Sequence, residues 1–474
     1  MNTKKIILAL AAGCALSATA QEATRTAYFL DGYTYRHELN PAFAGDHNYI
    51  SIPVLSNINV GLQSNVGLNT FLYKTQPGSL YKLTTFMSPT VDAGEFLGKL
   101  KDSNNLNTNI DLSIFSFGFK GFKGFNTVSI GVHTDVGMCL PKDLFAFMKL
   151  GQTGDDTRYN LKDLSVNANA YAEVALGHSH KINDKLNIGA KVKFLFGVGN
   201  VSAKISNMDV VLSNQQWHIN AVGEMQMAAG TGLIVPTKRE VGADYTNPND
   251  ADLIEWDEID YDSFGLSGFG VGVDLGATYQ LLPNLQLSAA INDLGCMNWK
   301  NAVTAKTGTT EWTFDGFQDV AFIDKQPGYE ENKIDEQFDH LWDDLQDAVN
   351  FHRESTDGSY SKALHATLRL GAEYGMPFYN NLTAGFLFSS YFAGQQSWQE
   401  GRFYLNIKPL KWFNATVNYG ASTFGSSLGW MLNFHPKGIN LFVGTDCQFL
   451  SVTPQYVPVG NANVNVNLGF NIAF

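Results

Sequence analysis

Hydrophobic and polar residues alternate one by one along most of the chain. The pattern is clearest in the last fourteen residues, NANVNVNLGFNIAF. Such alternation places the two sets on opposite faces of a β-strand. The apolar set here is Val464, Val466, Leu468, Phe470, Ile472 and Phe474. The C-terminus therefore predicts a strand with one apolar and one polar face.

The same pattern recurs often enough to predict 14 strands. They span residues 48–60, 109–120, 126–138, 165–180, 186–199, 264–281, 285–295, 363–375, 382–394, 402–409, 412–422, 426–435, 439–449 and 462–474. Many run 9 to 13 residues, longer than the average globular strand of about 5–6 residues and long enough for a tilted membrane strand, which needs about 9–11. Between Ile114 and Phe115 the apolar set changes face, which predicts a β-bulge. Segments 203–212 and 217–227 also alternate, and form either a hairpin in a long connection or two further wall strands.

The connections alternate between short and long. Short turns are expected at 181–185, 282–284, 379–381, 408–411 and 435–438, and long connections at 139–164, 200–263 and 296–362. This alternation is typical of outer-membrane barrels. Helices are expected at 142–150, around 92–100, and in the acidic segment 331–351. An unpaired edge is costly in hydrocarbon, so the last strand should pair with the first. The sequence predicts an all-β, transmembrane antiparallel β-barrel of about 14 strands with short helices in its loops.

Composition and charge narrow the class of protein. The 474 residues carry a net charge of −13, which disfavours nucleic acid as a partner. Residues 1–20 have the basic, apolar and small-residue regions of a signal peptide, and a lipoprotein signal ending at Cys14 is the alternative. After them no run of about 18 apolar residues occurs. The expected division is a signal peptide at 1–20, an N-terminal periplasmic or plug segment at 21–47, and the barrel at 48–474.

Candidate chemistry is sparse, and we assign no catalytic, cofactor-binding or metal-binding residue. The acidic stretch 249–258 lacks the glycine and the spaced glutamate of an EF-hand loop. His178 and His180 share a strand face without a third metal ligand. The glycines at 268, 270 and 272 precede no helix, so they predict close packing in a strand rather than a dinucleotide site. Cys139, Cys296 and Cys447 are odd in number, which leaves at most a bridge between the first two. The chain is therefore not expected to be an enzyme.

Three short motifs carry a resemblance to known barrels. Asn40 and Pro41, in the stretch LNPAFAG at 39–45, resemble the N-P-A motif of Bacteroidota outer-membrane barrels, including barrel components of type IX secretion. Asp293, Gly295 and Trp299, together with segment 112–119, resemble an exported Bacteroidota family of unknown function. The layout is similar to the 14-stranded long-chain fatty-acid transporter barrels. The C-terminal strand, which ends in Phe474, resembles the signal read by barrel assembly machinery.

The resemblance implies the outer membrane of a Gram-negative bacterium, with its lipid and the barrel assembly machinery as partners. Aromatic residues near strand ends, namely Tyr279, Trp299, Trp412 and Tyr419, are expected at the membrane interfaces. Two functional hypotheses follow. One is passive transport of small or hydrophobic molecules, and the other is a non-enzymatic scaffold in type IX secretion or surface assembly, with a secretion or surface partner.

Overall fold

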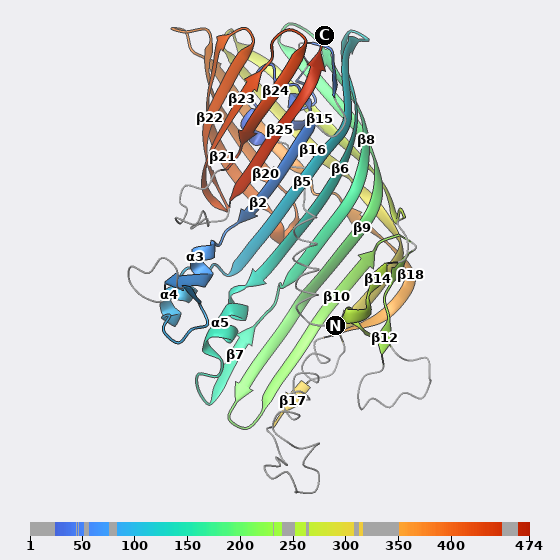
Figure 1. The fold of residues 1–474 in the computed structure, drawn as a ribbon, viewed down its shortest axis with the longest axis vertical. Coiled ribbons are helices and arrows are strands. Elements are labelled where there is room, and N and C mark those ends of the chain that lie inside the picture. The colour runs from blue at the N-terminus through green and yellow to red at the C-terminus, as the bar shows by residue number, and fades with distance from the viewer. Residues whose placement is uncertain are drawn as a thin grey trace.

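Most of the chain forms one large antiparallel sheet (Figure 1). The computed structural model describes residues 24–43, 45, 47–51, 56–74, 83–230, 232–238, 252–261, 265–307, 312–315, 350–447 and 463–474. Fourteen wall positions follow one another around the sheet. They are β1 (Tyr49–Ser51) with β2 (Asn57–Ser64), β5 (Ser103–Gly121), β6 (Gly124–Pro141), β8 (Ser165–Lys181), β9 (Leu186–Ser213), β15 (Gly268–Leu282), β16 (Leu285–Thr307), β19 (Thr367–Gly375), β20 (Leu382–Tyr391), β21 (Trp398–Leu410), β22 (Phe413–Ser422), β23 (Gly425–Phe434), β24 (Ile439–Thr445) and β25 (Val464–Ala473).

The sheet closes on itself. β25 pairs with β24 on one side and with β1 and β2 on the other. In the closing ladder Val466 lies opposite Val60 and Ile472 lies opposite Ile50. Closure leaves no free edge in the ring. The predicted barrel, its antiparallel pairing and its count of 14 strands are confirmed.

The two faces of the wall differ in polarity, because neighbouring residues of a strand point to opposite sides. On β21, Phe403 is 65% exposed on the outer face, whereas the next inward residue, Arg402, is fully buried. On β25, Val466 and Leu468 are exposed outward and Asn467 between them is buried. The exterior is thus apolar and the lumen polar, as the alternation predicts.

One side of the barrel extends far beyond the rest (Figure 1). β9 has 28 residues and β16 has 23, more than twice the about 10 residues of a membrane strand. Beyond the end of β15, β10 (Trp217–Ala228) fills the place between them, pairing with both. The segment 203–212 therefore continues β9, and 217–227 forms a hairpin with it rather than a further wall position.

The long connections contain more strand than expected. β18 (Phe351–Ala363) pairs with the outer half of β16, so the connection predicted at 296–362 begins and ends as strand. Alternation alone does not tell where a strand leaves the barrel. The remaining strands are β3 (Leu72–Lys74), β4 (Leu83–Thr85), β7 (Asp156–Asn160), β11 (Leu233–Ile234), β12 (Thr237–Lys238), β13 (Leu253–Ile254), β14 (Asp260–Tyr261) and β17 (Trp312–Phe314).

The helices are short. They are η1 (Arg25–Ala27), α2 (Arg36–Leu39), α3 (Leu68–Phe71), α4 (Ala93–Gly98), α5 (Lys142–Leu150), η2 (Trp256–Glu258) and η3 (Gly394–Gln396). The helices predicted at 142–150 and near 92–100 are confirmed, and Asp92 caps α4 by accepting a hydrogen bond from the Glu95 amide (2.7 Å). The signal peptide and residues 331–349 of the predicted helix lie outside the described residues, and Phe351, the last residue of that prediction, begins β18 instead. No helix in the described ranges has the length and hydropathy to cross a membrane.

Two strand irregularities matter for the lumen. The register of β5 against β6 shifts between Ser113 and Phe115, which confirms the predicted bulge. β16 contains a second bulge at Asn292 and Asp293, where its register against β15 skips two residues. Asp293 there has a φ of +61°, in the left-handed region. A bulge shifts the alternation of the strand, so that the side chains after it point to the opposite face.

Candidate functional site: a lumen filled by the N-terminal segment

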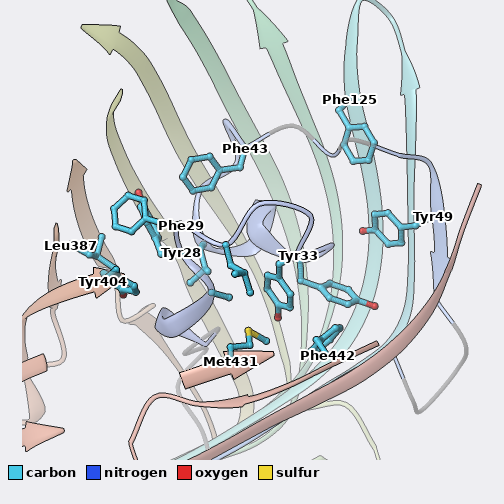
Figure 2. Packing of buried hydrophobic residues seen from close by; sticks show 14 residues of the cluster. Tyr28, Phe29, Tyr33, Phe43, Tyr49, Phe125, Leu387, Tyr404, Met431 and Phe442 are labelled. Carbon is cyan, nitrogen blue, oxygen red and sulfur yellow. The ribbon is translucent and has the colours of Figure 1, made fainter. Parts of the chain in front are cut away.

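Residues 24–43 lie inside the barrel, and we call them the plug. Figure 2 shows their aromatic side chains packed together and against the inner wall. Tyr33 meets Phe442 of β24 edge to face, with ring centroids 4.9 Å apart, and Phe29 meets Tyr404 of β21 in the same way at 5.1 Å. Such pairs contribute about 0.5–1.5 kcal/mol beyond burial. The plug contains only η1 and α2 and adds no strand to the wall among the described residues.

Buried charges hold the start of the plug. The Asp446 carboxylate accepts hydrogen bonds from the backbone amides of Arg25 (3.0 Å) and Thr26 (2.6 Å). The Arg25 Nε lies 3.6 Å from both Asp446 and Glu400. Arg402 donates two hydrogen bonds of 2.8 Å to Glu400 and one of 2.9 Å to the Asp446 carbonyl. Two cations thus face two anions, and the pairing offsets the cost of burying each charge.

Wall amides hold the rest of the plug by its backbone. Asn440 donates to the Gly32 carbonyl (3.1 Å) and Asn292 to the Glu38 carbonyl (3.1 Å). Asn414 and Asn187 donate to plug carbonyls in the same way. A buried carbonyl without a partner costs free energy, and a plug outside the sheet has no ladder to supply one. The polar face that the sequence places in the lumen therefore satisfies the plug backbone.

Asn40 and Pro41 form the junction between the plug and the wall. The Asn40 side chain accepts from the Ala42 amide (2.9 Å) and donates to the Ala289 carbonyl on β16 (3.3 Å). Gly189 on β9 meets the Pro41 carbonyl so closely that a Cβ would lie 2.1 Å from it. The motif thus has a definite structural place, and its functional role stays a prediction.

Asp293, Gly295 and Trp299 surround the bulge of β16. Asp293 turns inward and accepts a hydrogen bond from Lys193 Nζ (2.6 Å). Trp299 was expected at the membrane interface, which is wrong: its side chain is 1% exposed and packs against Gly197 and Gly268 inside the wall. The bulge inserts one extra inward residue, so every later side chain of β16 changes face. The expected interfacial residues Tyr279, Trp412 and Tyr419 are exposed on the outer surface.

A group of charged side chains lines the lumen beside the plug. Lys193, which is fully buried, lies 3.1 Å from Asp274 and 3.7 Å from Glu173. His133 shares a hydrogen bond of 2.8 Å with Asp111 and lies 3.9 Å from Glu173. Among the described residues, no three His, Cys, Asp or Glu side chains are grouped to hold a metal ion. The wall here is charged rather than apolar.

Glu38 brings a titratable group of the plug into this region. It lines a lumen cavity with Asp111, Glu173, His133 and Lys191. Enclosure in the lumen raises the pKa of Glu38 to about 7, and the neighbouring Lys191 ammonium opposes the rise. The plug therefore carries a carboxyl whose charge changes near neutral pH.

Two cavities beside the plug, both lined by described residues, are small. The cavity beside Glu38 measures about 30 Å³, and a second one, lined by Trp299, Tyr171 and Lys362, measures about 60 Å³. These are volumes open to the centre of a water molecule, which needs about 10–15 Å³. Each of these two cavities has room for a few water molecules, so the plug fills most of the space around them.

Comparisons with known proteins give a family. The family described as "Family of unknown function (DUF5723)" matches residues 41–446. The chain belongs to this family. No curated protein matches the sequence. The match of this DUF5723 protein begins at Pro41 and covers the wall strands from β1 to β24.

Solved structures with a similar fold include three transport-related barrels. The Ralstonia pickettii toluene transporter TbuX is 10% identical, with 92% of each chain covered and a TM-score of 0.41. The P. putida toluene transporter TodX is 10% identical, with 92% of this chain and 91% of that chain covered and a TM-score of 0.37. A Pseudomonas aeruginosa FadL homologue is 10% identical, with 97% and 95% covered and a TM-score of 0.33. The barrel of the DUF5723 protein is established by its own strand pairings.

The C-terminal strand lies where the sequence places it. Ile472 and Phe474 are exposed on the outer surface, and Val464 and Phe470 are partly exposed. Recognition of this strand by assembly machinery stays a prediction.

The cysteines and the histidine pair named from the sequence form no site in the described part of the chain. The three cysteines Cys139, Cys296 and Cys447 are free thiols, so the disulfide that the sequence left open between the first two is absent. His178 and His180 lie side by side on β8, with ring centroids 5.7 Å apart.

Sequence reasoning missed the residues that hold the plug. Arg25, Glu400, Arg402 and Asp446 were not singled out, although Arg402 begins the predicted strand 402–409 and Glu400 lies two residues before it, and both point inward on β21. The available signal was the charged pair Glu400 and Arg402, two residues apart on the lumen face. The pair holds the plug only together with Arg25 and Asp446, which are 421 residues apart in the sequence. No local pattern links them.

Proposed function

We propose that this DUF5723 protein is an outer-membrane barrel that passes small molecules when its plug moves aside. The closed ring, the apolar exterior and the polar lumen support insertion into a membrane, because only a closed sheet satisfies every backbone group in hydrocarbon. A ring of 14 strands is wide enough to need filling or to conduct solute. The charged lumen favours small polar molecules over hydrophobic ones.

One observation carries the proposal: the plug closes the lumen without being part of the wall. Side chains and plug carbonyls make its contacts, whereas the wall is held by ladders between neighbouring strands. Displacement of residues 24–43 therefore leaves the ladders of the ring intact. A closure that is separable from the wall is what a gate requires.

Conductance in planar lipid bilayers tests the proposal. The full-length protein should conduct little, and a variant lacking residues 24–43 should conduct steadily. A second variant keeps the plug in place. Thr34 donates to Asn471 of β25 (3.0 Å), so T34C with N471C should form a tether in a background with Cys139, Cys296 and Cys447 replaced by serine. The tethered barrel should stay closed until a reductant is added.

The outcome depends on a folded barrel, which migration on unheated gels reports. A folded deletion variant that conducts no more than the full-length protein would contradict the proposal. So would a tethered protein that conducts as often before reduction as after it. Replacement of Thr34 alone by cysteine is the matched control, since it removes the same hydroxyl without forming a tether.

The one-sided extension favours a second function, that of a non-enzymatic scaffold in surface assembly or type IX secretion. Its sheet carries two apolar clusters of its own beyond the barrel, one around Met225, Ile254 and Phe351 and one around Tyr159, Val210 and Ile219. A transport wall does not need a separately packed sheet outside the membrane. Cross-linking in cells should then capture a partner in stoichiometric amount, and a clean monomer would count against this function.

A further inference from the structure

A wide cavity opens at the short-turn end of the barrel, the end at which the C-terminus lies (Figure 1). We call it the turn-side vestibule. It measures about 700 Å³ and is bounded by the turns 120–125 and 179–187, by β15 and β16, and by Gly45 just after the plug. Binding pockets for small molecules measure about 300–1,000 Å³. The vestibule is therefore large enough for a ligand, unlike the cavities beside the plug.

The charge of the vestibule is opposite to that of the protein. Four lysines and one carboxylate line it: Lys120, Lys123, Lys181, Lys185 and Asp184. The chain as a whole has a net charge of −13. Asp184 accepts from Lys181 (2.8 Å), so the lining retains three formal positive charges in excess. Clefts lined by one sign of charge concentrate the oppositely charged solute.

Strand geometry aims two of these lysines at the lumen. On β5 the inward residues after the bulge are Ser116 and Gly118, and Lys120 continues this set. On β8 the inward residues Glu173 and Ser179 lead to Lys181 by the same alternation. These ammonium groups are thus placed at the mouth rather than on the outer surface of the barrel.

Neutral donors complete the lining. Ser179, Thr278, Asn187, Gln280 and Gln286 add hydroxyl and amide groups between the lysines. The apolar part of the described lining comes from Phe125, Leu186, glycines and the alkyl chains of the lysines. The excess of lysines over carboxylates repels a cation and attracts an anion. We propose that the turn-side vestibule binds a small anion with two or more carboxylate or phosphate groups.

The vestibule adjoins the base of the plug. Asn187, one of its lining residues, donates to the Ala42 carbonyl, and Gly45 borders the cavity directly. A bound anion would therefore lie against the segment that follows the Asn40–Pro41 junction. Binding at this site does not rest on the proposed function, because it needs neither a membrane nor conduction.

Calorimetric titration of the full-length protein in neutral detergent tests the site. Citrate and pyrophosphate are the probes, and glucose is the uncharged control. Lys120→Gln with Lys181→Gln should weaken binding at least tenfold, because the double variant removes two of the positive charges that attract the anion. Lys408→Gln with Lys411→Gln, on another turn of the same rim and outside the vestibule, is the matched control and should leave the affinity within twofold. Binding of citrate alone or pyrophosphate alone identifies the preferred anionic group.

Two results would overturn the proposal: no binding of either anion, or equal weakening by the vestibule pair and the control pair. If the first pair fails to fold, Lys123→Gln with Lys185→Gln removes the same charge from the turn tips, and unchanged binding by that pair also overturns it. A protein that binds citrate but never conducts would leave this site intact and refute the transport function. The two proposals therefore fail separately.

Discussion

Replacement of Asp446 by asparagine should loosen the plug without disturbing the wall. The carboxylate lies just beyond β24, is fully buried, and accepts from two plug amides. Asparagine has a similar shape but only one acceptor oxygen. It loses one hydrogen bond to a plug amide and the attraction to Arg25.

The magnitude follows from these contacts. A hydrogen bond to a charged group contributes about 1.5–3 kcal/mol. The loss of Asp446 as a counterion is softened because Arg25 keeps Glu400 at 3.6 Å. We expect a net loss of about 2–4 kcal/mol of plug docking, less than the about 3–5 kcal/mol for a pair left wholly uncompensated. At 1.4 kcal/mol per factor of ten, the displaced plug becomes about 30-fold to about 700-fold more populated.

Hydrogen exchange of the plug peptide, followed by mass spectrometry in detergent, measures this population. Amides of residues 24–35 should exchange faster by the same factor, while amides of β21 and β22 should not change. Asp156→Asn is the control, since it makes the same chemical change at an exposed carboxylate beside Arg158. If exchange of the plug in D446N stays within threefold of the parent protein, the buried charges do not hold the plug and the reasoning is wrong.

Three further changes probe the same contacts. Gly189→Ala puts a methyl against the Pro41 carbonyl, so it should destabilise the plugged state by about 1–3 kcal/mol in exchange measurements, whereas Gly154→Ala, with open space around it, should not. Lys193→Met leaves Asp293 without its lysine and Asp274 with only Lys191 at 3.9 Å, so it should lower the free energy of unfolding by about 3 kcal/mol. Added Asp274→Asn should restore part of this loss in denaturant titrations. Glu38 has a raised pKa in the folded state, so its contribution to the stability of the plugged state is complete below its ordinary pKa of 4.5 and is lost as pH rises through about 7. Hydrogen exchange of the plug, corrected for the intrinsic effect of pH, should accelerate over that window. Glu38→Gln should abolish this dependence.

The wall was predictable because a strand's alternation is a local property. The expected strands correspond in order to the 14 wall positions, and the terminal strand closes the ring as expected. The prediction for Trp299 failed because of a single extra residue in β16. The bulge at Asn292 and Asp293 reverses the faces of β16, and a parity count that ignores it places Trp299 in lipid instead of in the wall.

The contacts of the plug were not predictable, because its partners are distant in the sequence. Residues 24–43 show neither strand nor long-helix periodicity, and their position depends on contacts with β21, β24 and Asp446. The lumen-facing polar positions were visible in the sequence, but which of them bind the plug was not. The extension of β9 beyond residue 199 was hidden for another reason: alternation continues unchanged when a strand leaves the barrel.

The two charged regions of the lumen constrain what can cross. An anion held by Lys120 and Lys181 in the turn-side vestibule would next meet Glu38 of the plug and Glu173 of the wall, whose carboxylates repel it. A cation favoured by those carboxyls meets the lysines first. A positively charged vestibule followed by a negatively charged lumen disfavours the passage of both anions and cations. Neutral or zwitterionic molecules therefore meet the lowest electrostatic barrier. On this argument the vestibule anion is bound at the mouth and acts on the plug from there, rather than being the molecule that is passed.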